Sequence, residues 1–431
     1  MAIAAAALQK LVVQVFAGRF GRAGDIPERH FVLTPGHVTI GRSAAGEGLP
    51  MAKGTSAGLL DNQQAQSVFK HELLRGYALP FVVMTASKIP GRRAMVVDGY
   101  AGRGRYDDGR PASAELLLQA AHRARTSTQV EVLLVERSRQ DYRRLSTVAA
   151  EYRDQGLQVE AFHGQVQEHL PEIVSRADGV PLFLFLDPCG AILPFVELHR
   201  LLRRARGSSW PRTEALLNFS ADFTRRAAGV LHKNLHDHAA IQAMDAVCGG
   251  PWWRKVALEA HKSSRRADWE SAAEAVVTEY ARRLGAATNM KHVVVPVRRQ
   301  MHHQPVYHLV FLTRGEHGIW VFGHSAAAAR RAWLDVVGPG ADPPEGVLFN
   351  LAEFQQEDEE QRAIEEIKRN LVKLAGRDGS FKLAHHPQAV FGDAYGIAGD
   401  VLVRKAAREL HKAGTIRIDC TPKQVRDWLV G

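Results

Sequence analysis

Five short apolar runs alternate with helical patterns between residues 94 and 219, and no other feature constrains the fold as strongly. Helical periodicity fills most of the intervals, as in Gln140–Gln155 and Phe195–Arg206. Strands that are apolar throughout and separated by helices are typical of parallel strands covered on both faces. The sequence therefore predicts an α/β fold with a doubly wound, Rossmann-like sheet. The five runs are Ala94–Asp98, Val130–Glu136, Gln158–His163, Pro181–Asp187 and Glu214–Phe219.

The segments that flank this alternation extend the predicted domain to residues 61–335. An amphipathic helix over Gln64–Ser87 precedes the first strand. After the fifth strand, residues from about 222 to 285 read as a helical insertion. Two further strands, His292–Val297 and Val306–Thr313, are expected to complete the sheet.

The two ends of the chain differ in pattern from this central domain. The breaker cluster Gly338–Pro344 marks a domain boundary. Residues 345–431 contain helices followed by a tight turn and a short strand, which indicates a small winged-helix module. Two interpretations stay open for residues 1–60: a small extra subdomain, or an N-terminal extension upstream of the true start.

Composition and cysteine usage limit the class of protein. A content of 45% hydrophobic and 24% charged residues is that of a globular chain with a large core. No stretch approaches 18 uncharged apolar residues, so no transmembrane helix and no membrane partner are predicted. The 3 cysteines show no disulfide or CxxC pattern, which favours a reduced, cytoplasmic protein.

The formal net charge of +10 suggests contact with a polyanion such as RNA or DNA. Residues 221–335 carry 16 basic and 10 acidic side chains, so the excess is concentrated in the helical insertion and the last strands. In the C-terminal module, basic residues recur at every fourth position and so form a second stripe on one helix. Both a recognition helix and a solvated helix would show this pattern. The candidate nucleic-acid contacts are Arg225, Arg226, Arg254, Lys255 and the 254–266 cluster, with Arg404, Arg408 and Lys412 in the C-terminal stripe.

A glycine-rich turn follows the first predicted strand directly. Gly99, Gly102 and Gly104 allow a strand to turn sharply into a helix and a nucleoside to approach the backbone. Asp98 at the strand end would repel a phosphate but would suit a cofactor with a cationic amino-acid tail. S-adenosylmethionine is such a cofactor. Glu136 ends the next strand, where an acid accepts hydrogen bonds from ribose hydroxyls.

Asp187 and Pro188 follow the fourth strand. The segment resembles the Asp-Pro-Pro-aromatic loop of methyltransferases that modify exocyclic amines. In that loop the carboxylate and a backbone carbonyl bind the target NH2. Cys189 and Gly190 replace the second proline and the aromatic residue, so Phe195 or Phe219 would have to supply a surface on which a base stacks.

These motifs together resemble the three-Cys-motif partner protein (TcmP) family, which is methyltransferase-like and associates with a radical-SAM-like protein. The likeness covers residues 64–219 and weakens towards Trp333. The lysine-histidine helix and the glycine turn are also similar to the 23S rRNA adenine-N6 methyltransferases of the large-subunit J type. The matching segments are Phe69–Leu74, Val97–Tyr106, Pro111–Ser113, Leu186–Gly190 and Leu217–Phe219.

The resemblance implies a class I methyltransferase fold that binds S-adenosylmethionine through Lys70, His71, Ser113 and Glu136, with Asp187 on the target amine. Two departures concern catalysis. Gln165 stands where an acid often faces the adenine, and the Asp187 loop lacks its aromatic residue.

Two functions from different classes follow. The first is an S-adenosylmethionine-dependent methyltransferase acting on an exocyclic amine of nucleic acid. The second is a non-catalytic or weakly catalytic partner that docks a three-Cys-motif radical-SAM-like protein. No metal site is predicted, because neither cysteines nor well-spaced carboxylates accompany His232, His236 and His238. Gly-x-Ser-x-Gly and Walker sequences are both missing, which argues against a serine hydrolase or a P-loop enzyme.

Overall fold

The computed structural model describes residues 65–203, 212–264, 268–301, 303–337 and 351–431. The predicted N-terminal extension, residues 1–60, lies outside these ranges. The breaker cluster Gly338–Pro344 also lies outside them, and so do residues 265–266, the last two of the 254–266 basic cluster.

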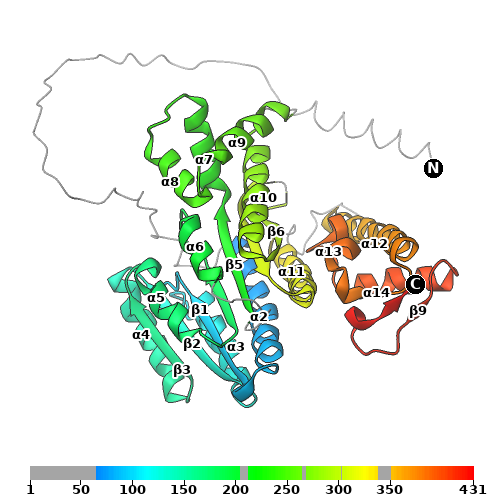
Figure 1. Cartoon of the computed structure of the whole chain (residues 1–431), viewed down its shortest axis with the longest axis horizontal. Coiled ribbons are helices and arrows are strands. Elements are labelled where there is room, and N and C mark those ends of the chain that lie inside the picture. Colours follow the sequence, from blue (N-terminus) through cyan, green and yellow to red (C-terminus); the bar gives the residue numbers. More distant parts are fainter. Residues whose placement is uncertain (1–64, 204–211, 265–267, 302, 338–350) are drawn as a thin grey trace, which may run out of the picture. The chain divides into compact units, whose positions relative to one another are not determined.

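A seven-stranded sheet in the order β3-β2-β1-β4-β5-β7-β6 forms the centre of the α/β part of the chain (Figure 1). Strands β1 to β5 pair in parallel, whereas β7 runs antiparallel to both β5 and β6. The predicted doubly wound sheet is confirmed, and so are its last two strands. The strands are β1 (Arg93–Asp98), β2 (Gln129–Glu136), β3 (Gln158–His163), β4 (Leu182–Leu186), β5 (Thr213–Ser220), β6 (Lys291–Arg298) and β7 (Pro305–Thr313).

Helices cover both faces of this sheet, because side chains alternate along each strand and both sets are apolar. On one face, side chains such as Val96 and Phe183 pack against α2 (Ala65–Ala86), α3 (Ser113–Ala124), α4 (Arg139–Asp154) and α11 (Glu316–Val337). On the other face, Val97 and Leu184 pack against α5 (Val166–Arg176), α6 (Phe195–Leu202) and further helices. All five residues of β4 are buried, as expected for a central strand.

Four helices separate β5 from β6. They are α7 (Ala221–His232), α8 (Ala239–Cys248), α9 (Trp252–Ser263) and α10 (Trp269–Thr288). Because α7 begins directly after β5, this group of helices extends from the carboxyl end of that strand (Figure 1). In the part of the chain that the structure describes, no helix combines the length and the hydropathy that a bilayer crossing requires.

The C-terminal segment has an apolar core of its own, with Ile367, Leu371, Phe391 and Val403 fully buried. It contains α12 (Leu351–Asp378), α13 (Pro387–Phe391) and α14 (Asp400–Lys412). Three two-residue strands form a small antiparallel sheet in the order β8-β10-β9. They are β8 (Phe381–Lys382), β9 (Ile418–Asp419) and β10 (Leu429–Val430).

Candidate cofactor and substrate site

The predicted glycine turn lies at the carboxyl end of β1, next to the ends of β2 and β4. Gly99 is required by close packing, because a Cβ at this position would collide with the Leu186 side chain and lie 3.0 Å from Val166. Gly102 is required by its backbone, which has a φ of 59°. A Cβ on Gly102 would meet nothing within 4 Å, so the turn presents bare backbone to open space.

We expect Gly99→Ala to destabilise the protein by about 1–3 kcal/mol, the usual cost of an extra methyl group in a tightly packed site. Urea unfolding of the two proteins measures this difference. Gly190→Ala is the matched control, because a Cβ there meets nothing within 4 Å. Equal stabilities for wild type and Gly99→Ala would show that β1 and β4 do not approach each other in this way.

Asp98 ends β1 and is fully buried. Its carboxylate accepts hydrogen bonds from the Tyr100 amide at 3.0 Å and from Ser113 Oγ, at the start of α3, at 3.1 Å. Burial, and to a smaller extent nearby Asp187, raises the pKa of Asp98 to about 7 against the opposing effects of the two hydrogen bonds and of Lys70. Asp98 is therefore poised to ionise fully only when a cation approaches.

Glu136 ends β2 and secures the glycine turn. Its Oε2 accepts a hydrogen bond from the Gly102 amide at 2.9 Å, and its Oε1 accepts one from the Ser138 amide at 2.6 Å. Desolvation raises the pKa of Glu136, and these two amides oppose that rise. Each carboxylate oxygen has two lone pairs, so Glu136 can still accept hydrogen bonds from ribose hydroxyls.

An ion pair joins Lys70 on α2 to Asp187 at the end of β4, 117 positions apart in the chain. The two side chains are 14% and 12% exposed. Asn218 on β5 donates a hydrogen bond from Nδ2 to the other carboxylate oxygen of Asp187 at 2.5 Å. These contacts bring the predicted residues Lys70 and Asp187 together, and they add Asn218, which was not among the predicted site residues.

Burial alone would lower the pKa of Lys70. Attraction by Asp187, then by Tyr307 and Tyr106, exceeds this effect and raises the pKa above its ordinary value. Lys70 is therefore a permanent cation in a largely dry cluster. Because Lys70 also acts electrostatically on Asp98, one cation and one buried acid lie within reach of each other.

His71 is 2% exposed and lies against Tyr106, with 3.5 Å between His71 Nε2 and the tyrosine hydroxyl. Burial, then repulsion by Lys70, lowers the pKa of His71 to about 3. The imidazole is neutral at physiological pH, so it can offer hydrogen bonds but no charge to a ligand.

Phe219 is 3% exposed and packs in the core with its ring 4.8 Å from that of Tyr280, so the suggestion that a base stacks on it is wrong. Gln165 precedes α5 as its N-cap, where its backbone amide donates to Glu168 Oε2 at 3.1 Å. Pro188 is buried beside Asp187.

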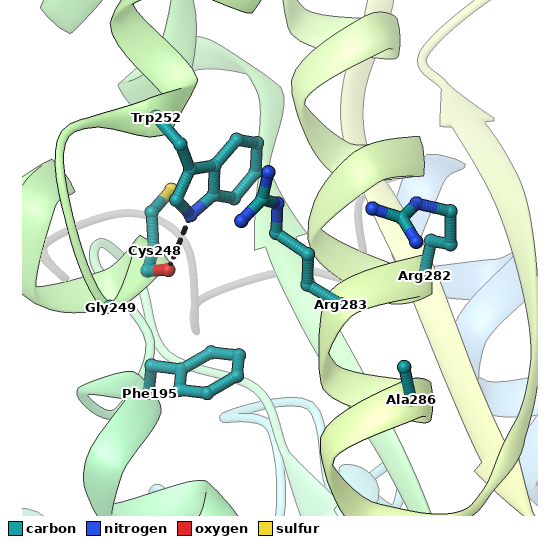
Figure 2. Close-up of a pocket in the computed structure, with 7 residues that line it drawn as sticks. All are labelled: Phe195, Cys248, Gly249, Trp252, Arg282, Arg283 and Ala286. Atoms are coloured by element: carbon teal, nitrogen blue, oxygen red, sulfur yellow. Dashed lines mark hydrogen bonds between the residues drawn. The ribbon is translucent and has the colours of Figure 1, made fainter.

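Phe195 lines an open pocket of about 350 Å³ between α6, α10 and the turn that joins α8 to α9 (Figure 2). The Arg283 guanidinium lies 4.5 Å from the centre of the Trp252 ring, and Trp252 Nε1 donates to the Cys248 carbonyl at 2.8 Å. Arg282 and Arg283 both pair with Glu279, which offsets part of their charge. The remaining lining residues are Gly249 and Ala286.

The predicted nucleic-acid contacts of the insertion fall into two groups. Arg225 and Arg254 are held internally, since Arg225 pairs with Asp222 and donates to the Pro305 carbonyl, while Arg254 pairs with Asp245. Arg226 and Lys255 are exposed, and Lys255 forms only a long contact of 3.7 Å with Glu259. Only the second group presents its charge to solvent.

The C-terminal stripe lies on the exposed side of α14. Arg404 and Arg408 are exposed, and each guanidinium carbon lies 5.8 Å from the centre of the Trp428 ring. Val403 and Ala407 on the opposite side are fully buried. The helix is therefore amphipathic, with its basic stripe directed away from the core.

Within the described ranges, no group of three histidine, cysteine or acidic side chains could hold a metal ion. His232 instead packs against His261 and Trp269, with ring centres 5.5 Å apart in both cases.

The residues at the carboxyl ends of β1, β2 and β4 fit a zwitterionic nucleoside. Asp98 and Ser113 offer acceptors for a cationic amine, and Lys70 offers a cation for a carboxylate. Glu136 offers acceptors for ribose hydroxyls, and the open backbone at Gly102 provides room for the sugar and base. The predicted binding residues therefore converge on one edge of the sheet, where ligands bind in open α/β folds.

No protein-family model matches the chain, and neither does any curated protein. Among solved structures, it is similar to M. jannaschii TYW2 in complex with AdoMet, at 10% identity and a TM-score of 0.25 over 60% of this chain and 78% of that one. It is also similar to a geranyl diphosphate methyltransferase in complex with GPP and sinefungin, at 12% identity and a TM-score of 0.22 over 55% and 77%. An uncharacterized Listeria monocytogenes protein matches at 8% identity and a TM-score of 0.25 over 75% and 97%.

The order and the directions of the strands identify the fold. In the order β3-β2-β1-β4-β5-β7-β6, β7 runs in the direction opposite to the other six strands of the sheet. This arrangement is that of the class I methyltransferase fold. The chain has this Rossmann-like fold.

Proposed function

We propose that this protein is an S-adenosylmethionine-dependent methyltransferase that acts on an exocyclic amine of RNA or DNA. The observation that carries the proposal is the convergence of Asp98, Glu136 and the Lys70–Asp187 pair at one edge of the sheet. A buried acid and a buried lysine at the same edge suit the amino and carboxylate groups of the cofactor. A phosphate-bearing dinucleotide would meet the unfavourable charge of Asp98.

The cofactor supplies an electrophilic methyl group when it is bound. Asp98 and Ser113 would hold its amine, Lys70 and neutral His71 its carboxylate end, and Glu136 its ribose. Asp187 would accept a hydrogen bond from the target amine and so orient the nitrogen lone pair. Catalysis of this kind rests on orientation, with little acid–base chemistry.

The test is transfer of a radiolabelled methyl group from S-adenosylmethionine to total RNA and to DNA. We expect transfer by the wild-type chain and its loss in Asp187→Asn, since the amide cannot accept a hydrogen bond through both of its polar atoms. S-adenosylhomocysteine binding by the same variant separates loss of catalysis from loss of the cofactor site. Transfer that does not depend on Asp187 would contradict this assignment.

A second function is supported by the missing aromatic residue in the Asp187 loop, whose position is taken by Gly190. In this alternative the chain is a weakly catalytic or non-catalytic member of the three-Cys-motif partner protein family. Its C-terminal segment would then dock a radical-SAM-like protein. Co-purification of a stable complex with an iron–sulfur protein supports this role, and methyl transfer that requires Asp187 counts against a non-catalytic one.

The C-terminal segment supports the winged-helix interpretation through its order of elements. A helix, a short strand, two helices and two short strands follow one another from α12 to β10. In that interpretation α14 is the recognition helix, and Arg404 and Arg408 are its outward contacts, for an acidic protein or for nucleic acid.

If the insertion contacts nucleic acid, the exposed cations should determine the salt dependence of binding. We expect the double variant Arg226→Gln/Lys255→Gln to lower the slope of log K against log salt by about two units, or one per lost phosphate contact. Arg254→Gln is the matched control, because its guanidinium is held by Asp245. Fluorescence anisotropy with labelled RNA at several salt concentrations measures the slope, and an unchanged slope would exclude this surface.

A further inference from the structure

Asn218 is a buried amide, 7% exposed, on the strand beside Asp187. Its side chain lies on the sheet face that α2 covers, since Leu217 and Phe219, its neighbours along the strand, both belong to the opposite core. An amide in such a position normally has partners for both its oxygen and its nitrogen.

The contact with Asp187 fixes the orientation of this amide. An ionised carboxylate only accepts hydrogen bonds, so the Asn218 NH2 group must face Asp187. The carbonyl oxygen, Oδ1, therefore points away from the carboxylate oxygen that Nδ2 contacts.

Oδ1 is buried and has no hydrogen-bond partner among the described residues. Glu214 lies four positions earlier on the same strand and provides a contrast, because both of its oxygens are bonded, to Tyr77 and to Thr313. An unpaired buried acceptor is unfavourable, and a ligand that donates to it removes that penalty on binding.

We propose that Asn218 is a substrate-recognition residue whose Oδ1 accepts a hydrogen bond from the same amine that Asp187 binds. This inference rests on the proposed function and adds a second residue that recognises the exocyclic NH2 group of the base. One N–H of the amine would face Asp187 and the other would face Asn218.

Lys70 does not donate to this acceptor. Its ammonium group contacts the Asp187 oxygen that Asn218 does not occupy. Lys70 and Asp187 are the partly exposed members of the trio. An amine that enters the cluster meets these two first, and displacement of Lys70 from the carboxylate would let it donate to both Asp187 and Oδ1.

The experiment uses the full chain saturated with S-adenosylhomocysteine and labelled single-stranded oligonucleotides. Oligo-A is compared with oligo-inosine, and oligo-C with oligo-U, because the second member of each pair lacks the amine. We expect wild type to bind the amine-bearing member at least about tenfold more tightly, because the amine donates to two acceptors, Asp187 and Asn218. Asn218→Ala should lower this ratio about tenfold, the contribution of one paired buried acceptor, while binding S-adenosylhomocysteine as wild type does.

The conservative variant Asn218→Asp separates recognition from support of Asp187. The introduced carboxyl group keeps the size of the amide and an acceptor oxygen in place of Oδ1. We expect this variant to retain the ratio.

Two results would overturn the proposal: equal affinities for both members of each pair in wild type, or an unchanged ratio in Asn218→Ala. A wild-type chain that binds no S-adenosylhomocysteine contradicts the proposed function instead. The oligonucleotide ratio, measured without that ligand, then still decides the role of Asn218.

Discussion

Replacing Asp98 by asparagine is expected to weaken S-adenosylhomocysteine binding about a hundredfold, the loss of one buried charge-assisted contact. The physical reason is the position of the carboxylate, which is fully buried and held by the Tyr100 amide and Ser113. Asparagine keeps the shape and can accept from the amide, but it offers no charge to a cationic amine. Calorimetry with the two proteins measures the difference.

The same substitution should stabilise the free protein above pH 7. The pKa of Asp98 is raised to about 7, chiefly by burial. Between the ordinary pKa of an aspartate and pH 7, the folded state therefore holds a proton that the unfolded state has lost, so stability falls as pH rises. The advantage of Asp98→Asn should grow from pH 4 to pH 7 and then level off, at about 4 kcal/mol as an upper bound.

Glu214→Gln is the matched control for this pair of effects. Glu214 is also a buried acid whose pKa is raised by desolvation, but it bonds Tyr77 and Thr313 inside the core. Its replacement should leave S-adenosylhomocysteine affinity unchanged. Equal loss of affinity in both variants would show that any buried acid of this sheet affects binding through stability alone.

Breaking the Lys70–Asp187 pair is the second change with a large expected effect. Lys70→Met leaves a nearly buried carboxylate without its cation, which costs about 3–5 kcal/mol in folding stability. Urea unfolding at pH 7.5 measures this loss. The double variant Lys70→Met/Asp187→Leu should recover most of the stability, since it removes both charges from a largely dry site.

Lys255→Met serves as the control for that experiment. Its ion pair with Glu259 is 81% and 63% exposed, so its removal should not change stability measurably. If Lys70→Met were as stable as wild type, Lys70 and Asp187 would not form the ion pair in solution.

The sequence was sufficient to predict the sheet and the glycine turn because both depend on local patterns. Each of the five apolar runs corresponds to a strand within a few residues, and Asp98 ends the first of them as predicted. Asp98 and Glu136 could be predicted as ligand-binding acids because they lie at strand ends. The carboxyl ends of parallel strands meet at one edge of the sheet.

The contacts between distant segments could not be predicted in this way. Lys70 and Asp187 are 117 positions apart, and a helix pattern gives no information on which strand end its lysine meets. Phe219 has an aromatic ring on which a base could stack, but side chains alternate along the strand and that of Phe219 faces the core. Asn218 could have been singled out by the same alternation, as a polar residue within a buried strand.

Calorimetric titration of the full chain with S-adenosylhomocysteine from pH 5.5 to pH 8 tests directly whether this site binds the cofactor. We expect one ligand to bind per chain, with an affinity that stays the same above pH 7. Below pH 7 it should fall about tenfold per unit, because Asp98 must then lose a proton to meet the cationic amine. Absence of binding at pH 8, or an affinity that does not change with pH in wild type, would contradict cofactor binding through Asp98.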